Sequence, residues 1–244
     1  MKVQIDCTAN LGDFVNSLPV LSGLSKSIGK IDFIIRGEMK KFNGIKEFLM
    51  YQDIFSSVEF DDEVFTYGDD IIKMSSWTRE DKEVSDRPIE TCRYENWIND
   101  NYRILFEVDD DFVLKVEDLG FDVGDHVYGG DRWSGPNIDG RRSSWTLAHL
   151  DGIKFLDYND SLMKNSYIIK NSKHPFVSTF TGISGVADLL NKQQVVLWGD
   201  DIRNWDNKPI TYSFEKHFYG NRNSKLMYLG DFELAKLNEY FKLQ

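Results

Sequence analysis

One short stretch contains residue types that can hold a phosphate group. Residues 181–185, TGISG, follow an apolar run at 175–180 and precede a helical pattern. A helix that starts here has unpaired N–H groups and a partial positive charge, and its glycines let a ligand approach the backbone. The stretch predicts a phosphate-binding turn, with Thr181 or Ser184 as the helix cap. The alternative is an ordinary turn whose glycines only serve close packing.

Asp13 is a candidate proton acceptor. It follows Gly12 on the segment that leaves the first apolar run, Val3–Cys7. Open α/β sheets place their ligands at the carboxyl ends of their strands, where a carboxylate can take a proton from a bound substrate. The alternative role of Asp13 is to cap the following helix, a common use of Asp that contributes about 1 kcal/mol.

An arginine-rich loop follows the strand predicted at 126–128. Glycines make this loop flexible, and guanidinium groups match the geometry of phosphate oxygens. The loop therefore predicts a second set of phosphate donors, against the alternative of a surface loop with scattered arginines. Its candidate residues are Gly130, Arg132, Arg141, Arg142 and Ser143.

Several common catalytic patterns are missing from the sequence. There is no GxGxxG dinucleotide fingerprint, no GxxxxGK[ST] phosphate loop and no GxSxG nucleophile elbow. The four histidines lie far apart and lack the HxxxH or HExxH spacing of metal sites. The acidic run Asp109–Asp111 lacks EF-hand spacing and indicates a solvated turn. We therefore expect neither a metal ion nor a cofactor.

The order of the apolar runs predicts an α/β protein with parallel strands and crossover helices. The predicted elements are strands at 3–7, 31–35, 56–60, 126–128, 153–156, 175–180 and 195–198, and helices at 14–28, 38–50, 145–150, 161–169, 186–191 and 231–243. The segment 68–125 is less regular. We predict an N-terminal domain over residues 1–122, a second domain over 123–230 and a C-terminal helix over 231–244.

Charge is distributed unevenly along the chain. Residues 59–125 contain 21 acidic and 7 basic residues, a net charge of −14, whereas the whole chain carries −11 and the remainder therefore +3. The sequence offers no broad basic surface for nucleic acid, but its near-neutral parts are compatible with a phosphate-bearing ligand. Two isolated cysteines and the lack of a long apolar run lead us to expect a cytoplasmic protein without a membrane-spanning segment.

Two segments resemble glycosyltransferase family 9, the ADP-heptose:lipopolysaccharide heptosyltransferases, which have the GT-B fold. Residues 11–21, LGDFVNSLPVL, are similar to the family's first loop and helix, in which GD precedes LPxL. Residues 160–199 are similar to the family's donor-domain helix, strand, glycine turn and crossover. The chain departs from the family at Phe180, where the family has Asp, at Gly185, where it has His, and in arginines that replace a lysine-bearing phosphate loop.

The resemblance implies a GT-B-like α/β fold with two facing Rossmann-like domains and parallel sheets. It also implies transfer of a sugar from a nucleotide diphosphate sugar to an acceptor hydroxyl, without a metal ion and with inversion at the anomeric carbon. Asp13 matches the family's general base, and the arginine loop and the helix start would neutralise the leaving diphosphate. The residues expected to bind the nucleotide sugar are Gly12, Gly130, Arg132, Arg141, Arg142, Ser143, Thr181, Gly182, Ile183 and Ser184.

The acceptor stays open between a hydroxymethylated DNA base (as in phage DNA glycosylation), a glycan and a small metabolite. DNA binding would require basic side chains at the faces of the cleft, such as Lys40, Lys41, Arg203 and Arg222. A different class of function is a non-catalytic relative of the same fold that binds a nucleotide or a partner protein. Phe180 and Gly185 favour that alternative, whereas the Gly12-Asp13 pair disfavours it. We expect a monomer.

Overall fold

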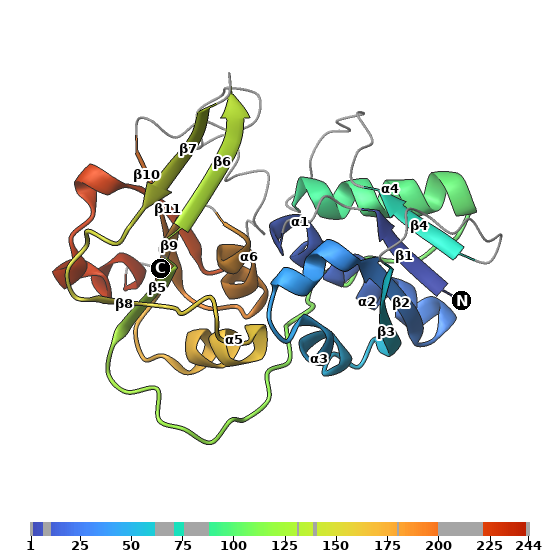
Figure 1. Cartoon of the computed structure of the whole chain (residues 1–244), viewed down its shortest axis with the longest axis horizontal. Helices are drawn as coiled ribbons and strands as arrows, with labels where there is room; N and C mark the ends of the chain where they lie inside the picture. Colours follow the sequence, from blue (N-terminus) through green and yellow to red (C-terminus); the bar gives the residue numbers. More distant parts are fainter. Residues whose placement is uncertain are drawn as a thin grey trace.

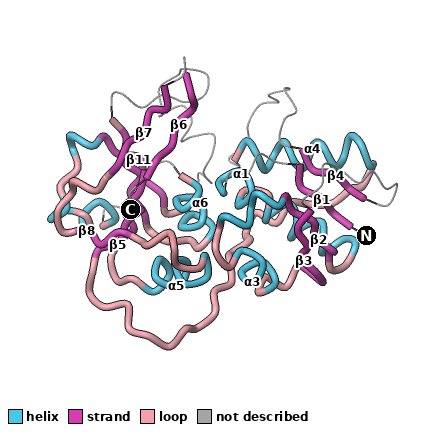
Figure 2. Tube along the Cα trace, in the orientation of Figure 1, coloured by secondary structure: helices cyan, strands magenta, loops and turns pink. Residues whose placement is uncertain are grey.

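The structure, a computed structural model, describes residues 2–6, 11–61, 71–75, 88–130, 132–138, 141–179, 181–199 and 222–242. Its elements form two domains that lie side by side, each built on a parallel sheet (Figure 1; Figure 2). A long segment without helices or strands, residues 103–126, runs from one domain to the other. The boundary predicted at residue 122 falls within this connecting segment.

The N-terminal domain has a four-stranded sheet in the order β3-β2-β1-β4, all parallel. Its strands are β1 (Lys2–Asp6), β2 (Ile31–Arg36), β3 (Phe55–Asp61) and β4 (Ile71–Ser75). Its helices are α1 (Leu11–Val15), α2 (Leu18–Ile28), the 3₁₀ helix η1 (Gly37–Lys41), α3 (Ile45–Met50) and α4 (Ile89–Tyr102). The alternation of buried and half-buried residues along β2 shows that one face of this strand carries the core.

The C-terminal domain has a five-stranded parallel sheet in the order β11-β10-β9-β5-β8. Its strands are β5 (Val127–Gly130), β8 (Ile153–Phe155), β9 (Phe176–Thr179), β10 (Gln194–Trp198) and β11 (Ser224–Tyr228), and its helices are α5 (Leu162–Asn171) and α6 (Gly182–Leu189). An antiparallel hairpin, β6 (Arg132–Ile138) with β7 (Arg141–Thr146), projects from this domain (Figure 1). The prediction of an α/β fold with parallel sheets is confirmed.

The helix predicted at 14–28 is two helices in the structure. The chain turns between α1 and α2, where the Ser17 hydroxyl donates a hydrogen bond of 2.6 Å to the Phe14 carbonyl. Pro19 then lies in the first turn of α2, where its missing N–H needs no partner. Pro19 therefore marks the start of a second helix instead of lying inside a single long one.

The predicted C-terminal helix at 231–243 is wrong. The segment instead forms three 3₁₀ turns: η2 (Leu229–Asp231), η3 (Leu234–Lys236) and η4 (Glu239–Phe241). These turns pack on one face of the second sheet, where Leu237 joins the buried cluster of Leu147, Val177, Val195 and Leu197. They cover an apolar face that a crossover helix would otherwise have to cover.

The helix predicted at 145–150 is also wrong, because the chain is extended from Arg141 to Thr146 as strand β7 and then turns. Three further elements were missed. They are β4, α4 and β11. Two of the three lie in or beside the acidic segment, where the apolar residues are sparse. None of the helices in the described ranges is long and apolar enough to cross a membrane.

The connecting segment is fixed to the N-terminal domain by polar side chains. The Gln52 side chain, which is 1% exposed, exchanges two hydrogen bonds of 2.9 Å with the backbone of Lys115. Asp109 pairs with Lys26 at 2.8 Å and accepts a hydrogen bond from the Ser22 hydroxyl at 2.6 Å. Burial alone would raise the pKa of Asp109, but its hydrogen bonds with Lys26 and Ser22 hold that pKa below its usual value.

Arg222 joins the connecting segment to the C-terminal domain. Its Nη1 donates to the carbonyl oxygen of Asp188 in α6 at 3.1 Å. Its Nη2 donates to the carbonyl oxygens of Asp110 at 2.9 Å and Phe112 at 2.8 Å. One planar guanidinium thus satisfies three backbone acceptors from two separate segments, a geometry that an ammonium group cannot reproduce.

We expect Arg222→Ala to lower the free energy of unfolding by about 2–3 kcal/mol, because it leaves three partly buried carbonyl groups without their donor. Arg222→Lys should recover less than half of this loss. Urea denaturation followed by circular dichroism measures both variants. A loss below about 0.5 kcal/mol in Arg222→Ala would show that water replaces the guanidinium without cost.

Candidate active site

In the N-terminal domain, the strand order reverses between β1 and β4. The chain leaves β1 towards β2 on one side of it and reaches β4 on the other side. Ligands of open α/β sheets bind at the carboxyl ends of the strands at such a reversal point. Helix α1 follows the carboxyl end of β1, and Asp13 is the third residue of α1. The side chain of Asp13 lies outside the described part of the structure, so its role as a base stays a prediction.

In the C-terminal domain, the strand order reverses between β5 and β9. These two strands are paired, with Gly130 opposite Ser178. The carboxyl ends of the pair are Gly130 and Thr179, and α6 starts three residues after Thr179. The reversal point therefore brings together Gly130 and the TGISG stretch, two of the segments that the sequence singled out for phosphate binding.

The start of α6 is ordered by its own side chains. The Ser184 hydroxyl accepts a hydrogen bond of 3.1 Å from the Thr181 N–H and donates one of 2.5 Å to the Thr181 carbonyl oxygen. Ser184 is fully buried, and this hydroxyl is committed to the helix start. Ile183 is also buried, so its side chain packs in the core and leaves the backbone N–H as the group through which it could bind a ligand. Both hydrogen bonds of the Ser184 hydroxyl stabilise the helix start, as the predicted capping role requires. They explain the serine at position 184 without a bound nucleotide.

Gly130 has a packing role that the sequence did not reveal. A Cβ atom at this position would lie 2.7 Å from Ile183 Cγ2 and 3.2 Å from the Tyr158 hydroxyl. Only glycine lets the end of β5 pass beneath α6. Tyr158, which is 39% exposed and follows β8, thus borders the reversal point. An aromatic residue just beyond the end of a strand was the signal that could have identified it.

Thr179 is a second residue that sequence reasoning missed. It is fully buried at the carboxyl end of β9, and its hydroxyl oxygen has no hydrogen-bond partner among the described residues. An unsatisfied buried hydroxyl has a free-energy cost, and such groups occur where a ligand or water completes the site. Thr179 therefore joins the candidate residues at the reversal point.

The arginine-rich segment is not a flexible loop but the β6–β7 hairpin. In its register Arg132 pairs with Thr146, Ile138 with Arg141, and Asn137 with Arg142. Ser143 lies in β7 next to this last pair. The hairpin leaves the carboxyl end of β5, so its base adjoins the reversal point. The side chains of the hairpin lie outside the described part, and their contact with phosphate stays a prediction.

The two reversal points face each other, because α1 packs directly on α6 (Figure 1). A Cβ atom at Gly12 would lie 3.6 Å from the Gly182 Cα, and one at Gly182 would lie 2.5 Å from the Leu11 Cβ. Gly182 therefore packs against the other domain, which gives a reason for glycine at this position that does not depend on a ligand. The residue after Gly12 is Asp13, so the candidate base sits on the helix that contacts α6.

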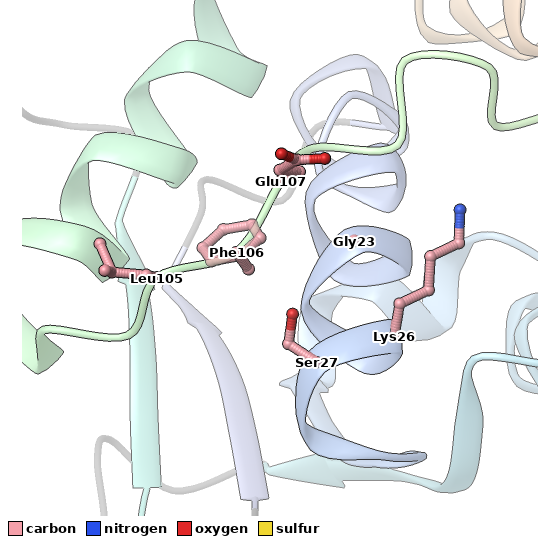
Figure 3. A pocket seen from close by; sticks show the side chains of 6 residues that line it. All are labelled: Gly23, Lys26, Ser27, Leu105, Phe106 and Glu107. Atoms are coloured by element: carbon pink, nitrogen blue, oxygen red, sulfur yellow. The ribbon is translucent and has the colours of Figure 1, made fainter.

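Other features of the described structure lie away from this site. A shallow hollow of about 470 Å³ lies between α2 and the connecting segment, lined by Gly23, Lys26, Ser27, Leu105, Phe106 and Glu107 (Figure 3). Burial lowers the pKa of Lys192 to about 8, but Lys192 lies at the opposite end of α6. Within the described ranges, no group of three His, Cys, Asp or Glu side chains could hold a metal ion.

The basic residues that DNA binding would require are mostly engaged elsewhere. Arg222 is bonded to three backbone carbonyls, as described above. The Lys40 ammonium lies 5.3 Å from the centre of the Phe60 ring, and that of Lys41 lies 5.1 Å from the Phe42 ring. Arg203 lies outside the described residues. Among the three described residues, the guanidinium of Arg222 is therefore committed to backbone carbonyls, and each lysine lies over an aromatic ring.

Comparison with known proteins finds likeness in shape alone. No protein family profile and no curated protein matches the sequence. The E. coli heptosyltransferase WaaC with ADP matches with a TM-score of 0.53 and 12% identity, covering 93% of this chain and 93% of its own. A glycosyltransferase of family 9 from Veillonella parvula DSM 2008 gives 0.57 and 11% identity, covering 100% of this chain and 90% of its own.

A second structure, WaaC with ADP-2-deoxy-2-fluoro heptose, gives a TM-score of 0.50 at 12% identity, covering 86% of this chain and 92% of its own. All three matches span both domains. The chain therefore has the two-domain, GT-B-like fold of family 9 glycosyltransferases, as the two resembling segments predicted.

Proposed function

We propose that this protein is a glycosyltransferase that moves a sugar from a nucleotide diphosphate sugar to an acceptor hydroxyl. The observation that carries the proposal is the contact between α1 and α6 at Gly12 and Gly182. It places the start of a helix, a favourable position for a diphosphate, beside the helix that contains Asp13. This reaction requires a carboxylate that activates the nucleophile and N–H donors that hold the leaving group.

In the proposed mechanism the diphosphate binds at the β5–β9 reversal point. The unpaired N–H groups of Gly182 and Ile183 at the start of α6 donate to it, and arginines of the β6–β7 hairpin neutralise its charge as it leaves. Asp13 takes the proton from the acceptor hydroxyl, which attacks the anomeric carbon from the face opposite the diphosphate. Inversion follows from this arrangement. We propose that no metal ion takes part.

The acceptor stays a proposal with three chemical candidates: a hydroxymethylated DNA base, a glycan and a small metabolite. The DNA candidate has no support from Arg222, whose guanidinium is already bonded to backbone carbonyls. A glycan or a small metabolite needs no extended basic surface. These two candidates therefore take precedence when acceptors are tested.

The test of the proposal is a thermal-shift panel of ADP-, UDP-, GDP- and CMP-sugars. ADP derivatives come first, because WaaC was solved with ADP and with an ADP-heptose analogue. A ligand at about 100 times its dissociation constant adds roughly 2.7 kcal/mol, which should raise the melting temperature by about 5–10 °C for a chain of this size. No shift with any donor would contradict the proposal.

The site variant for this panel is the double substitution Arg132→Ala/Arg142→Ala in the hairpin. It should weaken binding of the best nucleotide by about 1.5–3 kcal/mol, the range for charge-assisted hydrogen bonds, while the ligand-free melting temperature changes little. If the affinity is unchanged, the hairpin is only a surface feature and the phosphate donors lie elsewhere.

A further inference from the structure

Helix α6 carries two buried polar side chains on one face. Ser184 and Asp188 are four residues apart and therefore share that face of the helix. They are 0% and 3% exposed, although their neighbours Val186 and Ala187 belong to the apolar core. A helix that covers a sheet normally turns apolar side chains inward. These two polar residues therefore need partners, because an unpaired buried polar group has a free-energy cost.

The partners come from strands β10 and β11 of the same domain. Gln194, the first residue of β10, is fully buried, and its Nε2 donates to the Ser184 carbonyl oxygen at 2.9 Å and to the Ser224 hydroxyl at 2.7 Å. Ser224, the first residue of β11, donates to Asp188 Oδ1 at 2.8 Å. Gln194 Oε1 accepts a longer bond of 3.4 Å from the Ser178 hydroxyl of β9. One glutamine thus joins α6 to β9, β10 and β11.

This chain of hydrogen bonds reaches the helix start that is proposed to hold the diphosphate. The Ser184 hydroxyl is bonded to the N–H and the carbonyl oxygen of Thr181, and the Ser184 carbonyl oxygen accepts from Gln194. Ser184 is therefore held by the turn through its side chain and by the sheet through its backbone. Apolar contacts alone let a helix rotate or slide on a sheet, whereas buried hydrogen bonds restrict it to one position.

We propose that Gln194 is a positioning residue of the donor site: it fixes the rotation of α6 on the sheet and so fixes where the N–H groups of Gly182 and Ile183 point. The inference rests on the proposed function, because a bound diphosphate is what gives the direction of these groups a use. Gln194 acts through Ser184 and does not contact the ligand. It lies at the amino end of β10, whereas ligands of such sheets bind at the carboxyl ends of the strands.

The decisive variant is Gln194→Met, which keeps the length of the side chain and removes its hydrogen-bonding groups. We expect the affinity for ADP, measured by titration calorimetry on the folded protein, to fall about tenfold, the equivalent of one weakened bond between an N–H group and a charged oxygen. If the donor panel ranks another nucleotide first, its nucleoside diphosphate replaces ADP. An affinity within twofold of the parent would overturn the proposal.

Ser172→Ala is the matched control for a loss of stability. Ser172 is buried in the same domain, and its hydroxyl donates to the carbonyl oxygens of Ile169 and His174, neither of which lies in α6. We expect this variant to be less stable than the parent but to bind ADP with an affinity within twofold of it. An equal loss of affinity in Ser172→Ala and Gln194→Met would reduce Gln194 to a structural residue and overturn the proposal.

Amide hydrogen exchange tests the attachment of α6 without a nucleotide. We expect Gln194→Met to speed exchange in α6 about tenfold relative to α5, because a general loss of stability speeds exchange in both helices alike. An unchanged ratio would contradict the positioning role. If the parent binds no nucleoside diphosphate, the proposed function fails, whereas the exchange ratio still decides whether Gln194 holds α6.

Ser224→Ala is the second variant, and it decides the matter if Gln194→Met does not fold. It removes the link from Gln194 to Asp188 and leaves the bond from Gln194 to Ser184. The changes in ADP affinity and in the exchange ratio should therefore be smaller, about threefold each. In the double variant the two effects should not add, because both residues belong to one chain of hydrogen bonds. Parent-like values in Ser224→Ala, or additive losses in the double variant, would contradict such a chain.

Discussion

Asp13→Asn is expected to lower sugar transfer by about 10²–10⁴-fold, the usual contribution of a positioned general base. The substitution keeps the size of the side chain and an oxygen that accepts hydrogen bonds, but the amide cannot take a proton. Donor binding should stay near that of the parent, because the proposed site holds the diphosphate with α6 and the hairpin and not with Asp13. Release of nucleoside diphosphate from the donor identified by the binding panel measures transfer.

The structure changes the non-catalytic role that Asp13 can have. Because α1 begins at Leu11, Asp13 lies within the first turn of that helix and not at the cap position before it. A carboxylate in a first turn gains about 0.3–1 kcal/mol from the helix dipole, and Asn loses at most this amount. The structural alternative therefore predicts a slightly lower melting temperature and unchanged transfer. Transfer within about threefold of the parent would leave Asp13 without a catalytic role and favour the non-catalytic relative.

The sequence predicted the parts of the fold in which local patterns and tertiary structure agree. Apolar runs followed by small-residue turns located β1, β9 and β10, and these runs are central strands buried on both faces. The runs of β1 and β9 end at the two reversal points, so the pattern also located both halves of the candidate site. A central strand needs only its own sequence to be recognised.

The C-terminal turns show why helical spacing can mislead. Leu234, Leu237 and Tyr240 are spaced three residues apart, a spacing that suits both an α-helix and 3₁₀ turns. The structure has the 3₁₀ form, because the segment must spread over the face of a sheet. Helix α4 shows the opposite failure. Among the apolar side chains that the structure describes in it, Tyr94 and Ile98 alone are fully buried, so the apolar face was too short to stand out from an acidic sequence.

The contacts of the glycines could not be predicted from sequence. Gly182 was expected to let a ligand approach and Gly130 to make a binding loop flexible, and both meet other parts of the protein at short distance. A glycine in a turn after a strand has the same local signature whether a phosphate or another backbone lies beside it. Only the packing of the domains distinguishes the two cases.

Gly23→Ala should destabilise the protein severely, although the residue lies inside α2, where Ala normally stabilises a helix by about 1 kcal/mol over Gly. A Cβ atom at Gly23 would overlap the carbonyl oxygen of Glu107 and lie 3.1 Å from the Val108 Cα. Figure 3 shows this passage, in which the connecting segment runs across α2 at Gly23. Because the neighbouring atoms belong to the backbone of Glu107 and Val108, no side-chain rotation can relieve the overlap.

We therefore expect Gly23→Ala to lower the free energy of unfolding by about 3 kcal/mol, the upper range for overpacking, after the gain in helix propensity is subtracted. Ser27→Ala, one turn later on the same face of the helix but with an exposed side chain, is the matched control and should change stability by less than about 0.5 kcal/mol. Urea denaturation measures both variants, and proteolysis of the folded protein shows whether the connecting segment has detached from α2. A Gly23→Ala protein as stable as the parent would mean that the segment does not lie against this helix in solution. In that case the two bonds that Asp109 makes with Lys26 and Ser22 of the same helix would lose their support as well, since both depend on the same passage.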